Sequence, residues 1–203
     1  MKKSTLTLVI ILIHSITYSQ KSGNYILIIN NDTINVDLDK DISYKTASGE
    51  TLTIQVTQPE ILEYSDDMIS FSYQRSLGVS NAKIDDGIEQ CMVMKSTGSG
   101  FMVQKFKTIN PSGLTRFMLN EIIKESINYG YVKTEKEFKK KLLSGETIEG
   151  VQATLKYNDD TEIYTIATYG NKDQGIIVVT MQLNDDFDDT HIIELFLNTL
   201  RIK

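Results

Sequence analysis

Residues 149–169 have the sequence EGVQATLKYNDDTEIYTIATY, in which two β-prone runs flank the triplet Asn158-Asp159-Asp160. β-Branched and aromatic residues are enriched in strands, while Asn and Asp favour tight turns. We therefore predict strands over 149–157 and 161–169. They are expected to pair antiparallel, because a connection this short cannot make the crossover that parallel strands need.

The same pattern continues on both sides of this hairpin. Alternating apolar and polar residues, broken by Gly, Asn and Asp, predict a strand wherever one face of a sheet is buried. The further strands predicted in this way are 25–29, 33–38, 51–57, 69–73, 87–95, 101–107, 137–143 and 176–183.

Two segments have the spacing of amphipathic helices. The first follows Asn110-Pro111, with Ser112 as the expected N-cap and Gly130 as the expected terminator. The second covers about 189–200, where Asp188 and Asp189 suit a helix start and an apolar stripe recurs every three to four residues. That stripe consists of Ile192, Ile193, Phe196, Leu197 and Leu200.

This order of elements predicts an α+β fold: an antiparallel β-sheet flanked by helices in an αβα sandwich, with an N-terminal β-hairpin extension. Residues 20–203 are expected to form a single α+β domain, since this length suffices for one sizeable core. Within it, 20–60 is the β-rich extension and 61–203 is the core.

The amino terminus has the features of a secretory signal peptide over residues 1–19. Lys2 and Lys3 precede an apolar stretch that is too short to cross a bilayer as a helix, and small polar residues follow it. Cleavage is expected between Ser19 and Gln20, and a periplasmic or secreted product is expected. The alternative is a buried apolar strand.

Charge and cysteine content limit the possible partners. Loss of residues 1–19 would take two of the 21 basic residues and none of the 27 acidic ones, leaving a formal charge of −8. Such a balance disfavours nucleic acid, and no later segment is apolar enough to span a membrane. Cys91 is the one cysteine, so an intramolecular disulfide is impossible, and its apolar neighbours predict a buried thiol.

No residues form a recognisable catalytic or cofactor-binding motif, so the sequence predicts neither an enzyme nor a cofactor. His191 is the only histidine after residue 19 and is expected at the surface of a helix near acidic residues. Ser99, within Gly98-Ser99-Gly100, is explained by turn chemistry, since no strand-to-helix elbow surrounds it.

The weak candidate for a metal site is a calcium ligand set of Asp37, Asp39 and Asp41. Their spacing matches the start of an EF-hand loop, whose oxygen ligands suit a hard cation. The match then fails, because Ile42 stands where glycine is needed and Ser48 where the bidentate glutamate belongs. A second acidic cluster, which also lacks the glycine, comprises Asp185, Asp186, Asp188 and Asp189.

From Ile69 to the end, the chain resembles the PsbP-like and Ran-binding Mog superfamily. The resemblance rests on 69–73 as the opening strand, the helix after Asn110-Pro111-Ser112, the strand beginning at 148–153 with its Tyr-rich partner, and the closing segment 192–202. It departs at Gln74, where members often carry proline. The resemblance implies an αβα sandwich and a binding or accessory role. The short leader and the Asn-, Lys- and Ile-rich body also resemble exported proteins of the Bacteroidetes type.

The expected function is a non-enzymatic exported binding or accessory module, whose partner is another protein. The alternative is an immunity-like or chaperone-like protein that masks a secreted effector, because an acidic domain can complement a basic surface. A hydrolase that uses scattered carboxylates, such as Asp85-Asp86 and Asp159-Asp160, comes third.

Overall fold

The computed structural model describes residues 25–183 and 187–203, and the chain divides between Gln58 and Pro59 into two compact units. The predicted signal peptide and its Ser19–Gln20 cleavage point lie outside the described residues. So do Asp185 and Asp186 of the second acidic cluster.

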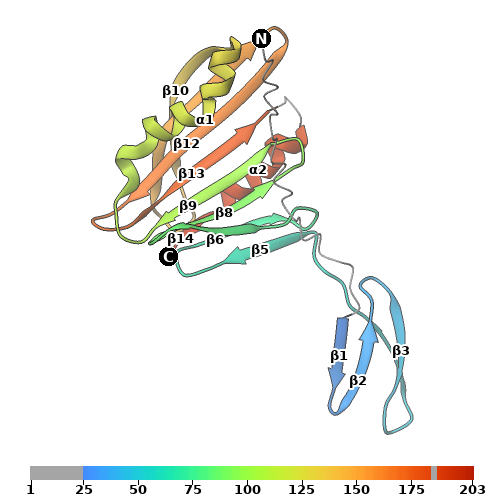
Figure 1. Ribbon diagram of the computed structural model, residues 1–203. Coiled ribbons are helices and arrows are strands. Elements are labelled where there is room, and N and C mark those ends of the chain that lie inside the picture. The colour runs from blue at the N-terminus through green and yellow to red at the C-terminus, as the bar shows by residue number, and fades with distance from the viewer. Residues whose placement is uncertain (1–24, 184–186) are drawn as a thin grey trace, which may run out of the picture. The chain divides into compact units, whose positions relative to one another are not determined.

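The amino-terminal unit consists of two antiparallel hairpins, β1–β2 and β3–β4 (Figure 1). Their strands are β1 Tyr25–Ile29, β2 Asp32–Val36, β3 Asp41–Lys45 and β4 Thr51–Gln55. A parallel bridge joins Leu38 to Val56, and the Tyr44 hydroxyl donates to Asp32 Oδ2 at 2.7 Å. These contacts connect the two hairpins to each other.

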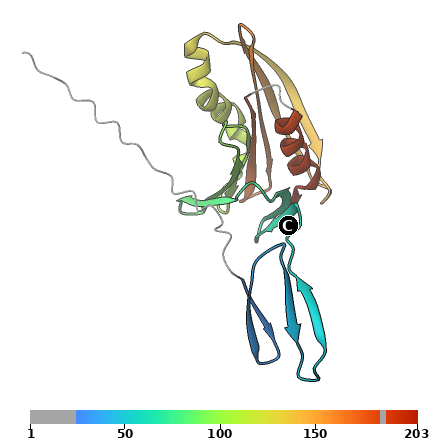
Figure 2. The ribbon, with the colours of Figure 1, turned by 90° about the vertical axis from the view of Figure 1, so that its right-hand side faces the viewer.

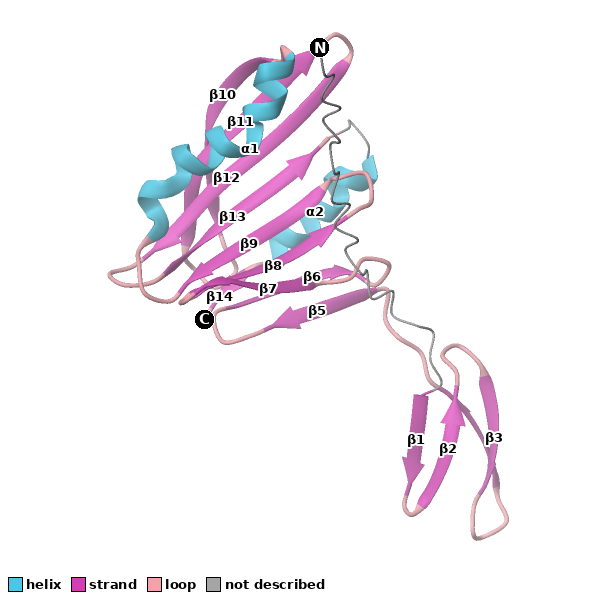
Figure 3. Ribbon diagram, in the orientation of Figure 1, coloured by secondary structure: helices cyan, strands magenta, loops and turns pink. Residues whose placement is uncertain are grey.

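The second unit contains ten strands and three helical segments in its described part (Figures 1 and 3). The strands are β5 Ile61–Ser65, β6 Ile69–Gln74, β7 Ser80–Asp85, β8 Ile88–Met94, β9 Gly100–Phe106, β10 Val132–Lys141, β11 Thr147–Tyr157, β12 Asp160–Gly170, β13 Gly175–Gln182 and β14 Arg201–Ile202. The helices are the 3-10 helix η1 Pro111–Leu114, α1 Thr115–Tyr129 and α2 Phe187–Thr199.

Seven of these strands form one antiparallel sheet in the order β10-β11-β12-β13-β9-β8-β7. The hairpin predicted from residues 149–169 is present as β11–β12, with Tyr157 opposite Asp160 across the turn. β13 lies between β12 and β9, so it joins a meander formed before α1 to one formed after it. A separate three-stranded sheet has the order β14-β6-β5.

Apolar side chains fill both sides of the large sheet. On one side, α1 packs over β11 and β12, with Leu119 and Ile123 fully buried. On the other side, α2 packs against β6, β9 and β13. There the ring of Phe196 stacks on Phe101 at 3.8 Å between centroids and meets Phe71 edge-on at 5.3 Å.

The predicted αβα sandwich is wrong. Strands hold 54% of the described residues and helices 18%, so the chain is mostly β. Figure 2 shows α1 and α2 against different sides of the seven-stranded sheet, but each is a single helix and not a layer. Beside α2 the core is closed by the three-stranded sheet, through Ile69 and Phe71 of β6.

The helix boundaries show one further difference from the prediction. Ser112 was expected to cap the first helix, but it lies within η1, and Leu114 precedes α1 without a side-chain cap. Asn110 caps η1 instead, because its Oδ1 accepts from the Ser112 amide at 3.0 Å. Gly130 ends α1 as predicted, in the left-handed conformation with φ 116°. Neither α1 nor α2 has the length and apolar character to cross a bilayer.

Candidate functional site

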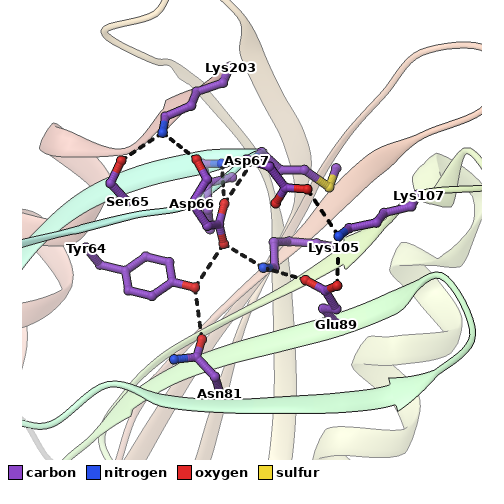
Figure 4. A network of polar contacts seen from close by, with 11 residues as sticks. Tyr64, Ser65, Asp66, Asp67, Asn81, Glu89, Lys105, Lys107 and Lys203 are labelled. Carbon is purple, nitrogen blue, oxygen red and sulfur yellow. Dashed lines mark hydrogen bonds and ion pairs between the residues drawn. The ribbon is translucent and has the colours of Figure 1, made fainter.

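A buried lysine lies in the middle of the second unit. Phe101, Val103 and Lys105 alternate on one side of β9, so the period-2 geometry of the strand carries Lys105 toward the core, where it is 3% exposed. A buried ammonium group is tolerated only when anions pair with it. Its Nζ donates to Asp66 Oδ2 at 2.5 Å and to Glu89 Oε2 at 3.0 Å (Figure 4).

Asp66 is held by several donors at once. Its Oδ1 accepts from the amides of Met68 and Ile69, both at 2.9 Å, and the Tyr64 hydroxyl lies 2.9 Å from its Oδ2. Burial alone would raise the pKa of Asp66, but these hydrogen bonds, above all that from Lys105, lower it to about 2. The carboxylate is therefore ionised throughout the physiological range.

Two further lysines extend the network to the surface. Lys107 pairs with Glu89 Oε1 at 2.7 Å and with Asp67 at 3.1 Å. Lys203 Nζ donates to Ser65 Oγ at 2.7 Å and to the Asp66 carbonyl. The charges alternate in sign along this network, and they connect the β5–β6 turn to β8, β9 and the carboxyl terminus (Figure 4).

A pocket of about 330 Å³ opens beside this network. It is lined by Tyr64, Asp66, Asn81, Ala82, Lys83, Glu89, Gln90 and Lys105. Although burial opposes its charge, the bonds to Asp66 and Glu89 raise the pKa of Lys105 above its usual value. A nucleophilic or basic lysine needs the opposite shift. The arrangement thus stabilises a permanent cation and anchors the β5–β6 turn.

A larger groove of about 660 Å³ lies on the α1 side of β10, β11 and β12, next to the start of α1. Several of its charged side chains already have partners: Arg116 with Glu135, and Lys139 with Glu149 at 2.5 Å. Thr168 contacts Thr115 and the Glu149 carbonyl only at 3.5 and 3.4 Å. The groove is polar and open, and its described groups do not converge on a reacting position.

The strand β1 has a different character. It consists of Tyr25-Ile26-Leu27-Ile28-Ile29, and within the described residues only β2 pairs with it. Ile26 and Ile28 lie on the same face and are 65% and 68% exposed. In a hairpin with a two-residue turn, the two residues that flank the turn, here Ile29 and Asp32, bond to each other through their backbone groups. Along the hairpin, every second pair of opposite residues is bonded in this way, so Leu27 bonds β2 but its neighbours do not. The backbone N–H and C=O groups of Ile26 and Ile28 therefore point away from β2.

The edge strands of the large sheet, β10 and β7, differ from β1 in their charged residues. Native proteins protect exposed strand edges with charged side chains, especially lysine, or with bulges. Seven of the ten residues of β10 are charged, and β7 carries Lys83 and Asp85 with an irregular register between them. β1 has no charged residue over its whole length. We call its outer side, residues 25–29, with which no described strand pairs, the β1 edge.

The residues singled out from the sequence lie apart from these features. Asp37 pairs with Lys40 at 2.8 Å, Asp39 adopts a left-handed conformation with φ 60°, and Asp41 begins β3. No group of three His, Cys, Asp or Glu side chains in the described part of the chain is placed to hold a metal ion. Asp85 and Asp86 lie at the β7–β8 turn, where Asp86 pairs with Lys83 at 2.6 Å.

Three other side chains can be placed directly. Cys91 is buried, as predicted, and burial raises the pKa of its thiol to about 11. Ser99 is buried in the β8–β9 turn, where its Oγ accepts from the Leu183 amide at 3.0 Å. His191 lies on the exposed side of α2.

The network around Lys105 was not predicted from the sequence. One signal was present, because pairing the predicted strands 87–95 and 101–107 around their turn places Glu89 opposite Lys105. Asp66 lies in the loop between β5 and β6. Nothing in the local sequence indicates that this loop reaches β9.

Comparison with known proteins does not assign a family. No family model matches the chain, and no curated protein is significantly similar to it. The resemblance to the PsbP-like and Mog superfamily therefore stays a prediction.

Proposed function

We propose that this protein is a non-enzymatic binding module that acts in the periplasm or outside the cell, and that its partner is another protein. The observation that carries the proposal is the β1 edge: five consecutive uncharged residues, with Ile26 and Ile28 exposed and no strand paired on the outer side within the described residues. The signal-like residues 1–19 support the location.

The chemistry of this edge favours a partner that adds a strand. An extended segment pairs with free backbone groups along a sheet edge, and the side chains on alternate positions give the specificity. At the β1 edge the backbone groups of Ile26 and Ile28 bond the incoming strand, while their side chains present an apolar surface beside Thr33 and Asn35. A small molecule would contact only part of this flat edge, whereas an extended polypeptide could pair along its whole length.

The experiment is a cross-linking pull-down of the tagged chain from the envelope and medium of its own organism. It compares the natural chain with a double variant, Ile26→Lys with Ile28→Lys. The matched control is Ile84→Lys, because Ile84 is 53% exposed on the edge strand β7 of the other unit. We expect one dominant partner with the natural chain and the control, and its loss with the double variant, since a desolvated lysine opposes pairing.

Hydrogen exchange on the purified complex tests the mode of binding. Partner binding should slow exchange of the Ile26 and Ile28 amides, which point outward, more than that of the Leu27 amide, which already bonds β2. Retention of the partner by the double variant would refute the β1 edge as the binding site. A blank pull-down, together with saturable binding of a metabolite, would overturn the proposal of a protein partner.

A further inference from the structure

Three tyrosines gather at one end of the second unit. Tyr129 is the last residue of α1, Tyr131 follows Gly130, and Tyr157 ends β11. Figures 1 and 2 both show this end of α1 beside the turn that joins β11 to β12. The ring centroids lie 5.0 Å apart for Tyr129 and Tyr157, 5.5 Å for Tyr131 and Tyr157, and 6.1 Å for Tyr129 and Tyr131. We call these three residues the tyrosine cluster.

Gly130 makes this gathering possible. Its φ of 116°, which glycine adopts readily, lets the chain reverse directly after the helix. The Tyr157 ring lies at ordinary contact distance, 3.5 Å from where a Cβ at residue 130 would be. Tyr129 meets Tyr157 at an interplanar angle of 69°, an edge-to-face contact that keeps aromatic surface accessible. Tyr129 itself is 69% exposed, and Val132 beside it is exposed as well.

The surroundings of the tyrosine cluster are acidic. Asp159 lies in the β11–β12 turn, Asp160 begins β12 opposite Tyr157, and Glu162 follows on the same strand. Glu162 Oε2 accepts from Ser126 Oγ at 2.7 Å and from the Tyr164 hydroxyl at 3.0 Å, so its position is set by two donors. Burial and the charges of Glu162 and Asp160 raise the pKa of Tyr131. No lysine or arginine of the described chain makes an ion pair with Asp159, Asp160 or Glu162.

We propose that the tyrosine cluster and the carboxylates of Asp160 and Glu162 bind an arginine side chain from a segment of another protein. The negative face of an aromatic ring attracts a cation within about 6 Å of its centroid, and arginine is the usual cation at such sites. A guanidinium group also stacks flat on a ring while it donates to a carboxylate, which an ammonium group does less well.

An arginine within a polypeptide fits this surface better than a free cation. Within the tyrosine cluster Tyr129 is exposed while Tyr131 and Tyr157 are half-buried, so a small ammonium ion would make few contacts there. A segment that carries arginine would also cover Tyr129 and Val132, and tyrosine and arginine are the residue types enriched at the centres of protein interfaces. This site lies in the second unit, so it does not depend on the β1 edge.

The test measures binding of a fluorescein-labelled peptide with the sequence Gly-Ser-Arg-Gly-Leu-Arg-Gly-Ser to the full chain by fluorescence anisotropy at low salt. A second peptide carries citrulline, which has the shape of arginine without its charge, at both arginine positions. The variants are Tyr129→Leu, Tyr129→Phe and Asp160→Asn. Phe117→Leu is the control, because Phe117 is another exposed aromatic residue of α1, 65% exposed. At a rise of 1.5 Å per residue, its Cα lies about 18 Å along the helix from that of Tyr129.

We expect the arginine peptide to bind and the citrulline peptide to bind at least about tenfold more weakly, because binding requires the charge. Tyr129→Leu and Asp160→Asn should each weaken binding by about 3- to 10-fold, while Tyr129→Phe and Phe117→Leu should change it less than about twofold. Equal binding of the two peptides, no binding at millimolar concentration, or an effect of Phe117→Leu as large as that of Tyr129→Leu would each overturn the proposal.

Discussion

The substitution Asp66→Asn should destabilise the second unit at neutral pH and much less at pH 2.5. It keeps the shape of the side chain and an oxygen for the Met68 and Ile69 amides, but it removes the charge that pairs with the buried Lys105. The pKa of Asp66 is about 2 against an ordinary value of 3.8. At about 1.4 kcal/mol per pKa unit, reduced for the partial contact of Asp66 with solvent, the charge contributes about 1–2 kcal/mol.

This contribution already contains the ion pair with Lys105, which keeps Glu89 but loses its closer partner. The expected loss at pH 7 is therefore about 1–2 kcal/mol. Because the pKa of Asp66 is lower in the folded chain than in the unfolded chain, the stabilisation from its charge depends on pH. The stabilisation is fully present above about pH 4, where the unfolded chain is also ionised, and it is lost as the pH falls through about 2.

The assay is urea unfolding followed by circular dichroism, because the chain has no tryptophan. The control is Asp67→Asn, a neighbouring change of the same chemistry at an exposed side chain that pairs with Lys107 at 3.1 Å. It should cost less than about 1 kcal/mol, as exposed ion pairs do. Two results would refute this account of the network. One is an equal loss of unfolding free energy in Asp66→Asn and Asp67→Asn. The other is a difference in unfolding free energy between Asp66→Asn and the natural chain that is the same at pH 7 and pH 2.5.

Two further outcomes are expected from the core. The buried thiol of Cys91, with its pKa of about 11, should not react with a disulfide reagent at pH 8 until denaturant is added, and fast reaction of the folded chain would contradict its burial. Gly150→Ala should cost more than about 2 kcal/mol, because its Cβ would lie 1.9 Å from the Ile166 carbonyl oxygen, whereas Gly113→Ala, with nothing within 4 Å, should be nearly neutral in the same urea titration.

Local patterns predicted many of the individual elements well. The strands around Asn158-Asp159-Asp160 and around Gly98, the first helix with its stop at Gly130, and the second helix all appear close to their expected positions. In each case a period-2 or period-3.6 apolar pattern ends at a residue with distinct turn or cap chemistry. Such information is local, so one sequence is enough to recover it.

The assembly of these elements was not recoverable in the same way. β7 has six exposed residues and so lacks the signal of a half-buried strand. β3 was missed although Ile42 and Tyr44 alternate with its polar residues. β5 was missed as well, and with it the three-stranded sheet that closes the core beside α2. Without these strands, the two helices were assigned a larger share of the packing than they have, which led to the incorrect αβα sandwich.

The candidate binding surfaces show the same limit. The run of five uncharged residues in β1 was visible in the sequence, but the meaning of that run depends on which edge of the strand is unpaired. The tyrosine cluster joins the end of α1 to the end of β11, two positions separated by a whole strand and its turns. Contacts between such distant positions arise from the topology, which the pattern of one sequence does not specify.

The central place of β13 has a consequence for the order in which the chain can fold. β7–β9 and β10–β12 can each form from neighbouring residues as they leave the ribosome, but among the described strands only β13, residues 175–182, joins them. Until those residues emerge, the two halves have no shared sheet, and α2 and β14 follow later still. We therefore expect the two meanders to stay separate, and the fold of this unit to stay incomplete, until residues 175–202 have been synthesised.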